Sequence, residues 1–226
     1  MRARTSRIVG RPACHARPPR GSCPFADPAA RYPPVKPFST VLVLTGCSAV
    51  ALVHLWLLFN SGLDPVSAPL ARLSQVPSGE WHGVALLLFA AAHLGLAALV
   101  YRPEGGRLHR IAVALIAVGA VLVVRVALHF ANDEGAAIGD SRPLWLLASV
   151  IGVAMGLLVP GLWRTRRPAA WFNLGCLAVW LALTPVFLVV PADWNGAYER
   201  LVGAVYTVWM IGLALLIGWR PRARSA

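Results

Sequence analysis

The sequence predicts an all-α protein, a polytopic transmembrane bundle of six helices with both termini in the cytoplasm. Hydrophobic residues make up 58% of the 226 residues and charged residues only 13%. An ordinary soluble domain has about 25% charged residues. Basic residues also alternate from one predicted loop to the next, as they do in membrane proteins. The composition therefore excludes a water-soluble globular domain and predicts an integral membrane protein.

Six apolar runs are long enough to cross a hydrocarbon core, which requires about 20 residues of helix. The runs lie at 38–59, 81–101, 111–131, 144–163, 169–190 and 200–219. The first run lacks a small-residue cleavage site followed by a soluble domain, so we expect it to stay in the membrane rather than act as a signal peptide.

These runs define one transmembrane domain, 37–220, flanked by two tails. Residues 1–36 are rich in proline and arginine. Proline lacks a backbone donor and fixes its own φ, so we expect a disordered cytoplasmic tail there. Residues 221–226 are expected to form a short basic cytoplasmic tail.

The distribution of charge predicts the orientation. Of the 21 lysines and arginines, 17 lie in the two tails and in the loops after the second and fourth runs. Only Arg72, Arg142 and Arg200 lie in the other loops, where most acidic residues are also found. Because basic loops remain in the cytoplasm, both termini are expected inside.

Tryptophans and net charge agree with this arrangement. Six tryptophans fall at predicted membrane boundaries, where the amphipathic indole ring prefers to lie: Trp81, Trp145, Trp194, Trp163, Trp171 and Trp219. The net charge of +12 is concentrated on the predicted inner side, where anionic headgroups attract it. We therefore expect membrane lipids as partners and no nucleic acid.

Ionisable residues gather in the predicted outer half of the membrane. Arg125 lies within the third run, with His129 one turn further out. The full candidate polar cluster is His54, Asp64, Glu80, His82, Arg125, His129, Asp133, Glu199 and Arg200. A charge inside a membrane helix costs about 2.5 kcal/mol or more, so the cluster needs a structural or a functional reason.

Two interpretations of this cluster remain open. In the structural interpretation, Arg125 extends toward the outer surface and pairs with Glu80 or Glu199. In the functional interpretation, the cluster lines an outward-opening cavity that binds a lipid headgroup, an anion or a metal.

The functional interpretation allows three classes of protein. The first is a non-enzymatic membrane protein that binds a lipid or a membrane partner. The second is a small transporter for an anion or a proton-coupled solute. The third is a metal-dependent hydrolase with ligands from His54, His82, His129 and Asp133. No paired metal-ligand motif, phosphate loop, nucleophile elbow or cysteine redox pair occurs in the sequence, so we predict no metal or cofactor and favour the non-enzymatic class.

A small-residue pair in the fourth run predicts close helix packing. Gly152 and Gly156 are four residues apart, a spacing that lets a neighbouring helix approach. Packing within the chain is the favoured interpretation, and a homo-oligomer through the same face is the alternative.

Three segments between about Pro37 and Trp219 share features with a known family: the segment 64–97, HFANDE at 129–134, and GAYERLVGAVYTVWMIGLALLI at 196–217. In these segments the chain resembles the uncharacterised prokaryotic membrane family known as domain of unknown function 998. Gly196, Glu199 and Arg200 match the family's Gly-x-x-Glu-Arg start to the last helix. The resemblance implies the six-helix membrane architecture in a prokaryotic cytoplasmic membrane and implies no activity.

Overall fold

Six long helices make up most of residues 35–132, 142–186 and 188–218, the parts of the chain that this computed structural model describes. They are α1 (Val35–Ser61), α2 (Glu80–Val100), α3 (Arg107–Asn132), α4 (Arg142–Thr165), α5 (Arg167–Val186) and α6 (Asn195–Gly218). Two short 3-10 helices, η2 (Leu70–Ser74) and η3 (Ala192–Trp194), precede α2 and α6. These described ranges contain no strand, which confirms the all-α prediction.

Each of the six helices contains a segment long and apolar enough to cross a membrane. Even the shortest segment, Arg167–Val186, has 20 residues and therefore spans about 30 Å, the thickness of a hydrocarbon core. The prediction of a multi-pass helical membrane bundle is confirmed. The inward orientation of both termini stays a prediction.

Several helix boundaries differ from the sequence prediction by up to five residues. α3 begins at Arg107 and α6 at Asn195, four and five residues before the predicted starts. α1 begins at Val35, inside the predicted tail, because Pro37 falls in the first turn, where a missing backbone donor costs no hydrogen bond. α5 ends at Val186, one residue after Pro185 and four residues before the predicted end. The remainder of the two predicted tails, 1–34 and 221–226, lies outside the described residues.

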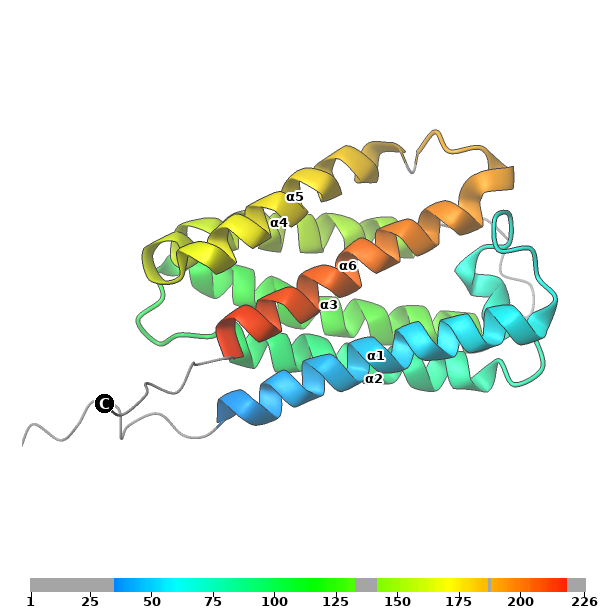
Figure 1. Ribbon diagram of the computed structural model, residues 1–226, viewed down its shortest axis with the longest axis horizontal. Helices are drawn as coiled ribbons and strands as arrows, with labels where there is room; N and C mark the ends of the chain where they lie inside the picture. Colours follow the sequence, from blue (N-terminus) through cyan, green and yellow to red (C-terminus); the bar gives the residue numbers. More distant parts are fainter. Residues whose placement is uncertain (1–34, 133–141, 187, 219–226) are drawn as a thin grey trace, which may run out of the picture. The chain divides into compact units, whose positions relative to one another are not determined.

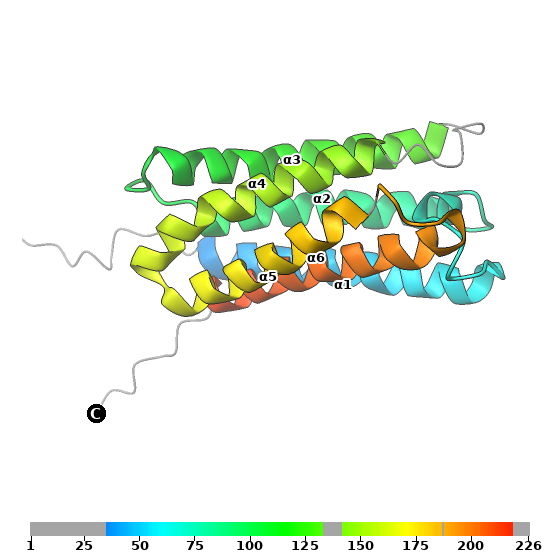
Figure 2. The same ribbon diagram turned by 90° about the horizontal axis from the view of Figure 1, so that it is seen from above.

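The six helices form an antiparallel ring in which each helix packs against its neighbours in sequence. α6 closes the ring by packing against α1, and it also contacts α2. Figure 2 shows α2 between α1 and α3, with α4 beside α3 and α6 beside α1. All six helices therefore contribute side chains to one interior.

The two ends of the bundle are formed by different loops. We call the end with residues 62–79 and 188–194 the distal end, and the end with residues 101–106 and Arg166 the proximal end. In Figure 1 the distal end, with its cyan and orange loops, is on the right. At the proximal end, Arg166 donates from Nη1 to the Leu216 carbonyl oxygen at 2.8 Å, which satisfies an acceptor in the last turn of α6.

Glycines allow two pairs of helices to approach closely. A Cβ on Gly46 of α1 would collide with the Leu88 carbonyl oxygen of α2. In α4, a Cβ on Gly152 would lie 3.2 Å from the Trp180 ring of α5, and one on Gly156 would lie 4.0 Å from Leu177. The Gly152 and Gly156 face thus packs within the chain, and a homo-oligomer through it stays a prediction.

A buried polar network joins α4, α5 and α6 near the middle of the bundle. Asn173 donates from Nδ2 to the Met155 carbonyl oxygen and accepts from Trp209 Nε1, both at 2.9 Å. Asn173 and Trp209 are fully buried. Because no water is present in a hydrocarbon core, these hydrogen bonds are the partners that the polar groups require.

The outer surfaces of the helices are apolar and suited to lipid contact. The exposed face of α3 follows the helical period, with exposed residues Ile111, Ala114, Val118, Val121, Arg125 and Leu128. The described boundary tryptophans are also exposed: Trp81, Trp145, Trp163, Trp171 and Trp194. Trp219 lies outside the described residues. The exposure of these rings fits contact with headgroups at the two membrane surfaces.

Candidate functional site

The structure brings four of the nine predicted cluster residues to the distal end of the bundle interior. Glu199 and Arg200 lie in the first turns of α6, His54 lies near the end of α1, and His82 lies near the start of α2. The side chain of His129 and the whole of Asp133 are outside what the structure describes. Asp64, Glu80 and Arg125 have different surroundings, described below.

Glu199 fixes α6 to the segment that precedes α2. Its Oε2 accepts a hydrogen bond from the Leu70 backbone amide at 2.6 Å. Only 7% of Glu199 is exposed. Leu70 is the first residue of η2, where the backbone amides have no partner within the helix, so a carboxylate is well placed to cap it.

Arg200 binds the same segment through its guanidinium group. Nη1 donates to the Pro65 carbonyl oxygen at 2.8 Å and to the Ala68 carbonyl oxygen at 2.9 Å. The Ala197 amide adds a hydrogen bond to the Val66 carbonyl oxygen at 2.8 Å. Together these contacts hold the distal segment, residues 62–79, against the start of α6.

Gly196 makes this contact possible. A Cβ at this position would collide with the Ala68 carbonyl oxygen and would lie 2.7 Å from Arg200 Nη1. The Gly-x-x-Glu-Arg pattern noted in the sequence therefore has a local physical explanation. Glycine permits the approach, and the glutamate and arginine bind the backbone that has approached.

Asp64 forms a local turn in the distal segment. It accepts from the Ser67 hydroxyl at 2.5 Å, the Ser67 amide at 3.1 Å and the Val66 amide at 3.2 Å. These hydrogen bonds, the one from the Ser67 hydroxyl above all, lower the pKa of the Asp64 carboxyl, and the charge of Arg200 adds a smaller effect. Asp64 is exposed and orders the loop rather than lining the interior.

His54 and His82 meet edge to face, with ring centroids 4.8 Å apart. His82 is 1% exposed. Within the described part of the chain, the buried Nε2 of His54 has no hydrogen-bond partner. Arg200 is close enough to His54 to interact with it electrostatically.

Arg125 does not belong to the interior cluster, which corrects the structural interpretation above. Its side chain is exposed on the lipid-facing stripe of α3, between Val121 and Leu128. Among the described residues it makes no ion pair with Glu80 or Glu199, and Glu199 is buried on α6 instead. Arg125 lies seven residues before the end of α3, about 10 Å by helical rise, and a long side chain near a helix end can reach toward the headgroups from the lipid side.

Glu80 is likewise exposed, in the first turn of α2. A carboxylate there interacts favourably with the positive end of the helix dipole. Glu80 therefore does not line the cavity described below, and a functional role for it stays a prediction.

A cavity of about 490 Å³ lies inside the distal half of the bundle. All six helices contribute to its lining, together with Leu70 of η2. Most lining side chains are aliphatic, such as Leu86, Val123 and Leu147. A volume of this size is typical of small-molecule sites, about 300–1,000 Å³, which are lined mainly by apolar residues with a few polar groups.

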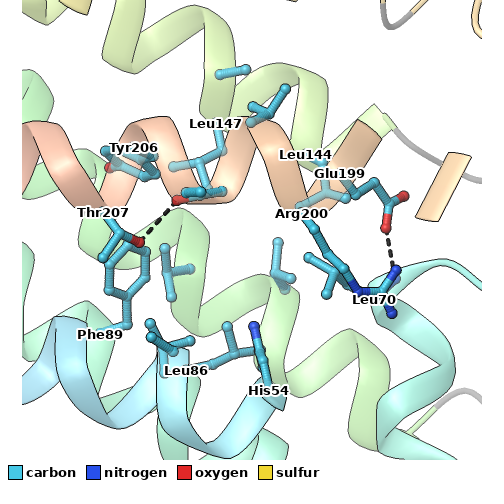
Figure 3. A pocket seen from close by; sticks show the side chains of 18 of the residues that line it. His54, Leu70, Leu86, Phe89, Leu144, Leu147, Glu199, Arg200, Tyr206 and Thr207 are labelled. Atoms are coloured by element: carbon cyan, nitrogen blue, oxygen red, sulfur yellow. Dashed lines mark hydrogen bonds between the residues drawn. The ribbon is translucent and has the colours of Figure 1, made fainter. Parts of the chain in front are cut away.

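The polar groups of the cavity lie mainly at one end. Figure 3 shows His54, Glu199 and Arg200 toward the distal side, where they form what we call the polar rim, and Phe89 and Tyr206 toward the other side. Arg200 Nη2 is buried and, within the described ranges, has no hydrogen-bond partner, as was found for His54 Nε2. The rim therefore presents two polar atoms whose hydrogen-bonding capacity the described chain does not use.

Aromatic rings close the cavity near the middle of the bundle. Tyr206 packs against Phe89 and Trp180, with centroids 5.4 and 5.6 Å apart. The Tyr206 hydroxyl hydrogen-bonds His93 Nε2, and His93 Nδ1 hydrogen-bonds the Phe89 carbonyl oxygen at 2.7 Å. A carbonyl can only accept, so His93 carries its proton on Nδ1 and accepts from the Tyr206 hydroxyl at Nε2.

The cavity also reaches the membrane-facing surface. Four of its lining residues on the neighbouring helices α1 and α6 are exposed: Ala51, Leu55, Ala204 and Val208. All four are apolar. The opening between α1 and α6 therefore faces the side of the bundle, where lipid acyl chains lie.

Sequence reasoning did not identify the residues that line the apolar part of this cavity. Gly203 is the most informative of them, since a Cβ there would meet no atom within 4 Å. Tyr206 and His93 were missed as a pair because they are 113 residues apart. The sequence signal for this region would have been a glycine and two polar residues at the same predicted depth in the membrane.

The metal hypothesis gains no support from side-chain geometry. Among the described residues, no group of three His, Cys, Asp or Glu side chains is placed to hold a metal ion. Two of the four proposed ligands, His129 and Asp133, fall outside this search, so that ligand set stays untested.

No protein-family model, curated protein or solved structure matches this chain. The resemblance to the domain of unknown function 998 family therefore stays a proposal.

Proposed function

We propose that this integral membrane protein binds a lipid by taking an acyl chain into the distal cavity. The observation that carries the proposal is the cavity itself. It has an aliphatic lining, an aromatic end near the middle of the bundle, a polar rim near the distal surface, and a lateral opening between α1 and α6. This order of apolar and polar groups matches the order along a lipid molecule in one leaflet.

The orientation expected from the positive-inside rule places this lipid in the outer leaflet. We propose this orientation on the distribution of basic residues, and a prokaryotic cytoplasmic membrane on the resemblance to the domain of unknown function 998 family. The proposal of a small inorganic anion as the ligand has less support. Such an ion would require several donors around it, whereas most of the lining is aliphatic and the charged groups lie at the distal end.

Lipid retained by purified protein tests the proposal. Gly203→Leu adds a side chain at a lining position where the added Cβ meets no atom within 4 Å. Gly175→Leu is a matched control, because Gly175 is an exposed residue of α5 where the added Cβ also meets no atom. Because both changes replace a helical glycine by leucine, both improve the helix propensity by the same amount, about 0.8–1 kcal/mol.

Mass spectrometry of extracted lipid should find about one tightly held lipid per chain in the unmodified protein and in Gly175→Leu. The Gly203→Leu protein should hold much less, since its side chain occupies part of the cavity. Equal lipid content in all three proteins would overturn the proposed function.

A further inference from the structure

The polar rim restricts which lipid the cavity accepts. We infer that the ligand places one acyl chain in the cavity and has a head with a hydrogen-bond acceptor oxygen, which binds between His54 Nε2 and Arg200 Nη2. This inference rests on the proposed function and specifies the ligand class for the same cavity.

The volume argues for one chain. A methylene group is about the size of a water molecule, which occupies about 30 Å³ in the liquid. At about 30 Å³ for each group, the cavity of about 490 Å³ holds about 16 methylene groups. One long acyl chain fills this space, and a second chain of equal length would have to remain in the surrounding membrane.

The rim argues for an acceptor in the head. A guanidinium nitrogen can only donate hydrogen bonds. Nη1 of Arg200 already donates to two carbonyl oxygens, of Pro65 and Ala68, which fixes the guanidinium in place. Nη2 is buried without a partner in the described structure, and a buried unpaired donor is costly. An oxygen of a carboxylate, phosphate or ester would satisfy it.

His54 contributes from the other side of the cavity. It belongs to α1, whereas Arg200 belongs to α6, and both residues line the cavity (Figure 3). Its Nε2 is the second buried atom at the rim that lacks a partner among the described residues. When protonated at Nε2, the ring donates toward the same acceptor, beside the positive charge of Arg200.

Glu199 provides the competing possibility, because its carboxylate also lines the rim. Its Oε2 is occupied by the Leu70 amide, but a carboxylate has capacity for further donors. A cationic head with donors only would bind here if Glu199 rather than Arg200 determined the choice. The two cases are distinguished by comparing heads on the same chain.

The cavity runs inward from the rim, and a long acyl chain would have to bend within it, because an extended chain is longer than the distance from the rim to the aromatic end. Arg200 and Tyr206 are six residues apart on α6, which corresponds to about 9 Å along the helix. Between them the lining is aliphatic, with Val202 and Gly203 on α6 and Leu86 on α2. No second polar head is accommodated along this length.

Tryptophan fluorescence offers a direct binding assay, because Trp145 and Trp180 line the cavity. We would titrate full-length protein in phosphatidylcholine nanodiscs with a brominated 16-carbon chain that quenches indole fluorescence. Unlabelled competitors would carry the same chain with different heads: palmitate and hexadecyl phosphate as charged acceptors, methyl palmitate as a neutral acceptor, and hexadecylammonium as a donor-only cation.

Acceptor-headed competitors should displace the brominated chain at concentrations about tenfold lower than hexadecylammonium, the ratio expected for one hydrogen bond to a charged donor. His54→Phe keeps the ring that contacts His82 but removes the nitrogen, and it should reduce this preference severalfold. Arg200→Lys should do the same, and His54→Phe remains informative if the lysine variant fails to hold the distal segment.

The result that overturns this inference is hexadecylammonium competing as well as the acceptors, or a preference that His54→Phe leaves unchanged. Either result is compatible with chain binding and leaves the proposed function intact. Failure of every competitor, together with quenching that Gly203→Leu does not alter, would instead reject the proposed function.

Discussion

Glu199→Ala tests the hydrogen bond that holds the distal segment against α6. The Leu70 amide donates to Glu199 Oε2 at 2.6 Å, and only 7% of the glutamate is exposed. A hydrogen bond to a charged group contributes about 1.5–3 kcal/mol. Because each 1.4 kcal/mol corresponds to a tenfold change, the opened population of this segment should rise about 10- to 150-fold.

Trypsin provides the assay, because Arg72 lies within the distal segment. The Arg72 side chain is exposed, but the next residue, Leu73, is completely buried. Cleavage after Arg72 therefore requires the segment to open. When opening and closing are fast relative to cleavage, the cleavage rate follows the opened population, so Glu199→Ala should be cut after Arg72 at least tenfold faster.

Two comparisons make this measurement specific. Glu199→Gln keeps an oxygen acceptor and should increase cleavage less than alanine does. Cleavage after the exposed Arg107, at the proximal end, should not change. An unchanged rate after Arg72 in Glu199→Ala would refute the proposed attachment, as would equal acceleration at both arginines.

Four further predictions concern other parts of the molecule. Asn173→Leu should lower the free energy of unfolding by about 1–2 kcal/mol, because it removes the partners of Trp209 Nε1 and the Met155 carbonyl; mixed-micelle unfolding measures this, and the exposed Asn60→Leu should have little effect. Arg125→Leu should leave the free energy of unfolding unchanged or raise it, since it removes a charge from a lipid-facing stripe. A fall of more than about 1 kcal/mol, which is a large fraction of a typical protein stability, would indicate that Arg125 has a partner. The turn at Asp64 should be intact at neutral pH and should loosen only when the pH falls below the ordinary pKa of aspartate, about 3.9. The reason is that the lowered pKa of Asp64 makes the ionised carboxylate the form that stabilises the turn. Hydrogen exchange of the Val66 and Ser67 amides measures this loosening, and Asp64→Asn should remove its pH dependence. A reporter fused after Arg222 should be cytoplasmic, and an extracytoplasmic reporter would contradict the proposed orientation.

The sequence was sufficient to predict the number of helices and their approximate bounds. Membrane-spanning length and apolar composition are imposed by the bilayer, so six runs could be counted directly. The position of Glu199 and Arg200 at the start of the last helix could also be predicted. Their hydrogen bonds to Leu70, Pro65 and Ala68 could not, because the partners are more than 120 residues away.

Arg125 illustrates why it is harder in a membrane protein to predict which side of a helix faces the bundle interior. The exposed stripe of α3 and its buried face are both apolar, since lipid is as apolar as the bundle interior. Helical periodicity therefore identifies two faces without identifying which one is inside. A charged residue suggested the interior, whereas a long side chain near the helix end can reach the headgroups from the lipid side.

The distal cavity could not be predicted because it depends on missing side-chain volume. Gly203 contributes by having no side chain at a position that lines the cavity, where an added Cβ would meet no atom within 4 Å. No motif marks such a space. The residues at its rim were singled out by charge, but the aliphatic residues below them look like any membrane helix.

Photo-crosslinking is the measurement that tests lipid binding in the cavity most directly. Palmitate with a diazirine near the middle of its chain would be added to the protein in nanodiscs, and its adducts would be mapped by mass spectrometry. We expect adducts on the cavity-lining residues Val50, His54 and Leu58 of α1 and Val202, Gly203 and Tyr206 of α6, displaced by excess palmitate. Adducts that are equally frequent on Val118 and Val121, on the lipid-facing stripe of α3, and that palmitate does not displace, would show only bulk lipid contact and contradict the account.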